Sequence, residues 1–136
     1  MSKKHIYLAG PIAGCTHGEA NDWRTDVSRR LPEGVVGISP LRCEPLITEK
    51  YELVYEDLLF GTAKAISSKN IYDLNTCDMV LAYLPQALEE KRPSIGTLME
   101  CGGAVWTGKP LILVTDNNYV RNHPLFAYGA NWVLDN

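Results

Sequence analysis

Five short apolar runs recur along the chain, and they limit its fold more than any other feature. The runs are His5–Ala9, Val35–Ser39, Met79–Leu84, Leu111–Thr115 and the weaker Asn131–Leu134. Most are continuously apolar instead of alternating, which is typical of strands that are covered on both faces. The runs therefore predict a parallel sheet of about five strands.

The segments between these runs have helical character. Glu19–Leu31 carries apolar residues at three- and four-residue spacing, and Tyr51–Ser67 repeats the pattern. Thr97–Thr107 is a third candidate, closed by Gly108 and a following proline. Strands that alternate with helices through right-handed connections indicate an open, doubly wound α/β domain with helices on both faces. With 136 residues and no linker or repeat, we expect residues 1–136 to form one domain.

Charge and composition exclude several partners. The net charge of −3, the isoelectric point near 5.6 and the lack of a Lys/Arg block give no footprint for a nucleic-acid polymer. The apolar run near the amino terminus is broken by Gly10 and Pro11, so it is too short for a secretion signal or a membrane span. We therefore expect small-molecule partners and no association with a membrane.

The cysteines point to a reducing compartment. All four are scattered among small or apolar residues, with no C-x-x-C pair and no histidine at metal-ligand spacing. They are interpreted as buried free thiols, and no metal site is predicted. We therefore expect a soluble, cytoplasmic protein.

The polar segment SIGTLMECGGA, residues 94–104, opens the third predicted helix. Ligands of doubly wound sheets bind at the carboxyl ends of the strands, and this segment follows one of them. Ser94, Gly96 and Thr97 would present unpaired backbone N–H groups and two hydroxyls to an anion or a sugar. The alternative is that Ser94 or Thr97 is simply the helix N-cap.

Glu100 is the most informative residue of this segment. It follows Thr97 at the capping-box spacing, so it could reach back and cap the helix. Its apolar neighbours and the pair Gly102–Gly103 instead favour a tightly packed helix with a partly desolvated carboxylate that faces a pocket. Such a carboxylate suits attack on an anomeric carbon, with formation of a covalent glycosyl ester.

Other polar residues are weaker candidates for the site. Tyr7 is a core tyrosine by default, although strand alternation could direct its phenol at the pocket. Arg42 follows the second strand and is placed to meet an anionic ligand, whereas Arg24 is interpreted as a solvated charge. Asp78 is interpreted as a turn or strand-edge residue.

Motifs across almost the whole chain resemble one known family. They are Tyr7-Leu8-Ala9-Gly10-Pro11, the run from Asp78 to Leu84, and Ser94-x-Gly96-Thr97-x-x-Glu100-x-Gly102-x-Ala104 followed by Gly108-Lys109-Pro110. In this order they resemble the nucleoside 2-deoxyribosyltransferases. The resemblance implies a flavodoxin-like fold and an enzyme without a cofactor that breaks the N-glycosidic bond of a 2'-deoxynucleoside, holds the sugar on a glutamate and passes it to a free nucleobase.

The resemblance also assigns roles to residues. Glu100 would be the nucleophile, and Tyr7 would orient it. The sugar and its substituents would contact Gly10, Pro11, Ser94, Gly96 and Thr97. Family members are oligomers whose sites borrow residues from an adjacent subunit, so a homo-oligomer is implied.

Two departures from the family pattern keep alternatives open. The transferases usually carry aspartates where this chain has Asn70 and Ser94. Asn70 can hold a base or a ribose hydroxyl but cannot donate a carboxylic proton, and Asp73 is the candidate substitute. Serine at position 94 resembles related hydrolases of deoxynucleoside 5'-monophosphates, because a hydroxyl accommodates phosphate. The alternatives are therefore such a hydrolase, or a nucleotide-binding module that has lost catalysis.

Overall fold

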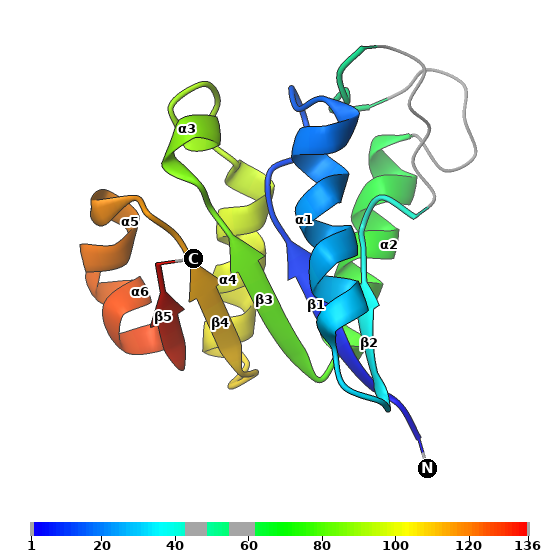
Figure 1. Ribbon diagram of the computed structural model, residues 1–136, viewed down its shortest axis with the longest axis vertical. Coiled ribbons are helices and arrows are strands. Elements are labelled where there is room, and N and C mark those ends of the chain that lie inside the picture. The colour runs from blue at the N-terminus through cyan, green and yellow to red at the C-terminus, as the bar shows by residue number, and fades with distance from the viewer. Residues whose placement is uncertain (1, 43–48, 55–61, 136) are drawn as a thin grey trace.

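A five-stranded parallel sheet forms the centre of the computed structural model, which describes residues 2–42, 49–54 and 62–135 (Figure 1). The strands are β1 (Lys4–Ala9), β2 (Val35–Ile38), β3 (Met79–Tyr83), β4 (Leu111–Val114) and β5 (Trp132–Leu134). They lie in the order β2-β1-β3-β4-β5, and every pairing is parallel. This is the flavodoxin-like order, in which the winding direction reverses between β1 and β3.

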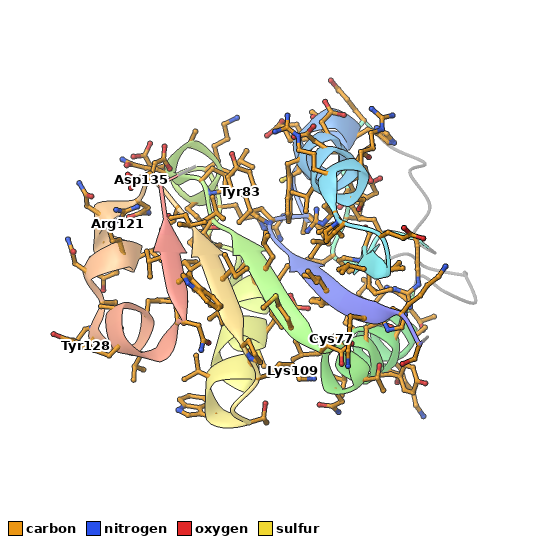
Figure 2. All side chains as sticks on the ribbon, turned by 60° about the horizontal axis from the view of Figure 1, so that its bottom comes forward. Cys77, Tyr83, Lys109, Arg121, Tyr128 and Asp135 are labelled. Atoms are coloured by element: carbon orange, nitrogen blue, oxygen red, sulfur yellow. The ribbon has the colours of Figure 1, made fainter. Side chains whose placement is uncertain are left out.

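Helices cover both faces of the sheet, as Figure 2 shows with α1 on one side and α2 and α4 on the other. The helices are α1 (His17–Arg30), α2 (Ala63–Thr76), α3 (Gln86–Glu89), α4 (Ile95–Trp106), α5 (Asn118–Asn122) and α6 (Pro124–Gly129). The side chains of Thr16 and Thr62 cap α1 and α2 by accepting hydrogen bonds from the backbone N–H groups of Glu19 and Ala65.

The core lies between the sheet and α4. Tyr7, Leu84, Leu111 and Leu113 are fully buried there, together with smaller residues of the same strands. A second, smaller cluster lies under the loop that follows β1 and contains Cys15, Ala20, Leu41 and Tyr51. A cavity opens at the carboxyl ends of β1 and β3.

The predicted doubly wound parallel sheet is confirmed, and each of the five apolar runs corresponds to a strand, although β1 begins one residue before its run, at Lys4. The predicted helix Tyr51–Ser67 is wrong at its start, because residues 51–54 are not helical and α2 begins at Ala63. Tyr51 instead makes two backbone hydrogen bonds of 2.8 Å to Gly14 and Cys15, which fix it against the loop after β1. Residues 55–61 of that prediction lie outside the described part of the chain.

Three further features bear on the predicted class of protein. In the described residues, no helix is long and apolar enough to cross a membrane. The same residues contain no cluster of three or more metal-binding side chains. Cys15, Cys77 and Cys101 are buried and free, whereas Cys43 lies outside the described ranges.

Candidate active site

A cavity of about 260 Å³ opens at the carboxyl ends of β1 and β3, where the winding reverses. The loop after β1, the segment before α4, the first turns of α4 and one side of α2 surround it. Its lining residues are Gly10, Pro11, Ile12, Ala13, Glu52, Leu53, Ile66, Asn70, Arg92, Pro93, Ser94, Ile95, Gly96, Thr97 and Glu100. The structure thus brings together seven of the predicted site residues: Gly10, Pro11, Asn70, Ser94, Gly96, Thr97 and Glu100.

Glu100 lies in the second turn of α4 and contributes a carboxylate to this cavity. Its Oε2 atom is buried and has no hydrogen-bond partner among the described residues. Burial raises the pKa of Glu100 to about 7, against the lowering effects of the Tyr7 hydroxyl and of the positive charges of Arg24 and Lys69. A carboxylate that only capped its helix would not leave an oxygen orphaned at a cavity.

Tyr7 lies beneath this carboxylate in β1 and is fully buried. Its hydroxyl approaches Glu100 closely enough to lower the pKa of the acid, but the pair falls short of a well-formed hydrogen bond, and the Tyr7 oxygen has no other partner in the described chain. Burial, followed by the negative charge of Glu100, raises the pKa of Tyr7 far above its ordinary value. Tyr7 therefore stays protonated, and its hydroxyl lies near the carboxylate.

The amino terminus of α4 also lines the cavity. Ser94 is the N-cap residue, but its side chain does not cap the helix. Its Oγ atom instead lies 2.6 Å from the Oγ1 atom of Thr97, which makes a pair of hydroxyls at the cavity wall. The backbone N–H of Ser94 is satisfied by Glu89, whose carboxylate accepts it at 3.1 Å.

Asn70 lines the cavity from α2, and a hydrogen bond from the neighbouring Lys69 orients its side chain. The ammonium group of Lys69 donates to the Oδ1 atom of Asn70 at 2.8 Å and also to the carbonyl oxygen of Pro40. The lysine thereby links α2 to the segment that follows β2.

Two predicted substrate-binding residues lie outside the cavity lining. Arg42 donates two hydrogen bonds, of 2.6 and 2.7 Å, to the buried carboxylate of Asp73 in the last turn of α2. The bidentate pair occupies the guanidinium that was expected to meet an anionic ligand. It also fixes Asp73, the candidate substitute acid, below the cavity wall in an ion pair.

The interpretation of Arg24 as a solvated charge is wrong, because its side chain is buried. Its guanidinium donates to the carbonyl oxygens of Leu8 and Gly10, at 3.1 and 2.9 Å, and to that of Ala20. Arg24 thus fixes the chain where β1 leaves the sheet. One sequence signal could have revealed it: Arg24 follows the buried Ala20 by one helical turn and shares its inward face.

Sequence reasoning missed Glu52, which lines the cavity, and it also missed Arg92 and Lys69. Arg92 lines the cavity, and the positive charge of Lys69, in α2, lowers the pKa of Glu100. Neither belongs to a periodic pattern or to a recognisable motif. No sequence signal could have found them, since the loop and helix that carry them come together only in the folded chain.

The fold and the site together define a class: a doubly wound α/β protein with a desolvated carboxylate in a cavity at the switch point of its sheet. A comparison with protein-family profiles identifies the family within this class. The nucleoside 2-deoxyribosyltransferase family profile matches residues 6–131, and the chain belongs to this family.

Solved structures support the same fold. One is similar over 97% of this chain and 86% of its own, with a TM-score of 0.68 and 16% identity, and is a 2-deoxyribosyltransferase from the psychrotolerant bacterium Bacillus psychrosaccharolyticus. Another, a conserved protein from Enterococcus faecalis V583, is similar over 97% of this chain and 82% of its own, with a TM-score of 0.60 and 17% identity. A comparison with curated protein sequences gives no significant match.

Proposed function

We propose that this protein breaks the N-glycosidic bond of 2'-deoxynucleosides and transfers the deoxyribosyl group to a free nucleobase through an ester on Glu100. The observation that carries the proposal is the orphaned, buried Oε2 atom of Glu100 at the cavity of a deoxyribosyltransferase-family chain. A desolvated carboxylate is a stronger nucleophile than a hydrated one, and it stabilises positive charge that develops at C1'.

The geometry of the cavity supports the following reaction. The ionised carboxylate attacks C1' while the bond from C1' to the base breaks, and a second base later displaces the ester. Tyr7 donates toward the carboxylate from below and keeps it oriented. The hydroxyls of Ser94 and Thr97, with the backbone at Gly96, hold the sugar. Gly10 and Pro11 close the cavity on the β1 side.

Mass spectrometry of the intact protein after exposure to a 2-fluoro-2-deoxy nucleoside tests the covalent step. Fluorine at C2' destabilises the electron-poor transition states for both formation and breakdown of the glycosyl ester. The ester should therefore persist on the wild-type protein, where it should be localised to Glu100. Glu100→Gln should give no adduct, and the exposed Glu33→Gln should behave as wild type. A wild-type protein without an adduct and without base exchange would contradict the proposal.

Base exchange measures the activity itself. Incubation with a deoxynucleoside and a second free base should give a new deoxynucleoside by chromatography. Glu100→Ala should lower the rate by about 10³-fold or more, because it removes the nucleophile. Turnover that stays at background in both proteins would identify a binding module without catalysis.

Hydrolysis of deoxynucleoside 5'-monophosphates is the second candidate. One observation favours it: Arg92 lines the same cavity as the hydroxyl pair of Ser94 and Thr97, beside the amino terminus of α4. A cation, two hydroxyls and a helix terminus suit a phosphate group. Release of free base without an acceptor, and a loss on Arg92→Gln that is confined to phosphorylated substrates, would select this activity.

We also propose that the protein is a cytoplasmic homo-oligomer. The free thiols of Cys15, Cys77 and Cys101 support a reducing compartment. An exposed apolar groove between α4 and the α5–α6 segment supports association with a second copy. Ile95 lines both this groove and the cavity, so a neighbouring copy would lie next to the bound substrate.

A further inference from the structure

The contacts of Lys69 fix the orientation of the Asn70 side chain. An ammonium group can only donate hydrogen bonds, so the amide oxygen of Asn70 must be the atom that faces Lys69, at 2.8 Å. The amide NH2 group of Asn70 is then left over, and it has no partner among the described residues. Because Asn70 lines the cavity, this side of the site offers a hydrogen-bond donor that cannot release a proton.

Carboxylic acids are scarce around this donor. Within the described lining, the only carboxyl groups are those of Glu52 and of Glu100, the proposed nucleophile. Asp73, the nearest acid of α2 in sequence, is held by Arg42 in a bidentate ion pair. The wall formed by α2 therefore presents an amide and, behind it, a positive charge.

We propose that Lys69 is a positioning residue for departure of the nucleobase: it directs the amide NH2 of Asn70 at the base, which leaves as an anion. The inference rests on the proposed function and deepens it. As an oxygen of Glu100 bonds to C1', the bond from C1' to the base nitrogen breaks and both of its electrons stay on the base. Asn70 donates a hydrogen bond to that anion and keeps its proton, and water protonates the base after release.

The ammonium strengthens the donor that it orients. A positive charge on the amide oxygen polarises the amide and makes its N–H groups better donors, and the effect is largest where the acceptor carries negative charge. The preferred substrates are consequently nucleosides whose bases form stable anions, such as uracil-like pyrimidines and oxopurines. Adenine and cytosine, which depart well only when protonated, should be poorer leaving groups.

Lys69 also acts on the nucleophile. The charged groups that face Glu100 are Arg24 and Lys69, which lower its pKa, and Asp73, which raises it, beside the hydroxyl of Tyr7 and the thiol of Cys101. Removing the lysine charge should raise the pKa of Glu100. The acid limb of the pH profile of kcat/KM should then move to higher pH, since the carboxylate must be ionised to attack.

A leaving-group series separates this role from a structural one. Base release from deoxynucleosides of uracil, 5-fluorouracil, hypoxanthine and adenine should slow as the departing anion becomes less stable. Lys69→Met should steepen this dependence, with a loss of about tenfold to a hundredfold for the poorest leaving group, the size of a hydrogen bond to a charged group. Lys69→Arg, which keeps the charge, should recover most of the rate.

Asn70→Asp is the complementary variant, because it supplies an acid in place of the amide. It should flatten the dependence on leaving group and make adenine release easier at low pH. A slope that Lys69→Met leaves unchanged, or that Glu52→Gln steepens instead, would overturn the inference while leaving the Glu100 ester intact. The latter result would identify Glu52 as the proton donor.

A binding measurement keeps the inference separate from turnover. The probe is free 5-fluorouracil, titrated calorimetrically into wild type, Lys69→Met and Lys69→Arg below and above the pH at which the base ionises. Wild type and Lys69→Arg should bind the anion more tightly than the neutral base, and Lys69→Met should lose that preference. If the preference is absent from wild type, the inference fails even where the sugar adduct forms. If it is present without any adduct, the proposed function fails alone.

Discussion

Two buried oxygen atoms, on Tyr7 and Glu100, lie at the centre of the candidate site without a full hydrogen bond. Orphaned polar atoms cost folding free energy, so two of them on neighbouring side chains, one of which lines the cavity, favour a role in binding or catalysis over one in stability. Burial is the main cause of both pKa shifts, and the two groups also act on each other, because the phenol lowers the pKa of the acid and the carboxylate raises that of the phenol.

The raised pKa of Glu100 predicts a stability that falls with pH. Between pH 4.5 and about 7 the folded state binds more protons at this group than the unfolded state does, so raising the pH destabilises the fold. Glu100→Gln removes the effect and should be more stable than wild type at pH 8, by up to about 3 kcal/mol, with the difference closing toward pH 5. Urea unfolding at both pH values measures it. A constant difference, or the same trend in Glu33→Gln, would contradict the prediction.

Tyr7→Phe tests the phenol. Loss of the hydroxyl should raise the pKa of Glu100 and move the acid limb of kcat/KM to higher pH, because the lowering effect of Tyr7 is gone. A shift of one pH unit would reduce the rate below the midpoint about tenfold. The free energy of unfolding should change by less than about 1 kcal/mol, since no well-formed hydrogen bond is broken. An unmoved pH profile would show that the phenol does not act on the carboxylate.

At the scale of the elements, two glycines of the cavity differ in the space around them. A Cβ atom on Gly10 would lie 2.6 Å from Cζ2 of Trp23 and 3.2 Å from the carbonyl oxygen of Tyr83, where β1 passes close to α1 and β3. A Cβ atom on Gly96, in the first turn of α4, would meet nothing within 4 Å. The first glycine is required by packing, and the second leaves room at the cavity.

Alanine at these positions should therefore have opposite effects on stability. Gly10→Ala should destabilise the fold by about 1–3 kcal/mol through overpacking. Gly96→Ala should stabilise α4 by about 0.5 kcal/mol through helix propensity, and yet raise KM because a methyl group enters the space for the sugar. Thermal unfolding and steady-state kinetics of both variants check this. Unchanged kinetics in Gly96→Ala would remove that residue from the sugar contacts.

The strands could be predicted from the sequence because burial on both faces makes each one a continuous apolar run, as in residues 79–84. The start of α2 could not. Tyr51 and Val54 have the three-residue spacing of a helix, but tertiary hydrogen bonds hold Tyr51 against the loop after β1, and Thr62 caps the helix further on. Polar residues interrupt the apolar spacing of α2, because Asn70 lines the cavity and Lys69 donates hydrogen bonds to Asn70 and Pro40.

The whole molecule determines which candidate residues meet. Ser94, Thr97 and Glu100 share one helix, so their spacing alone predicts that they lie together. Arg42 and Asp73, which are far apart in the sequence, could be judged only by residue type, and both suit an anion or a proton as well as each other. Long-range pairing of this kind depends on the relative placement of β2 and α2, which no local pattern contains.

The apolar groove between α4 and the α5–α6 segment is an exposed feature of the molecule's described surface. Tyr119 of α5 lines it and is 82% exposed, whereas Tyr128 of α6 is 91% exposed, does not line it and projects from the outer side of α6 in Figure 2. If a second copy covers this groove, the two tyrosines should differ in their effect on assembly although they have the same chemistry.

Tyr119→Lys should therefore dissociate the oligomer, because it places a charge in a surface that association removes from water, and Tyr128→Lys should leave it intact. Size-exclusion chromatography with light scattering, over a range of concentrations, gives the mass of each species. Adduct formation on Glu100 should decline in parallel with dissociation, since Ile95 joins the groove to the cavity. A monomeric wild type, or equal dissociation by both variants, would mean that this groove is not where copies of the chain meet.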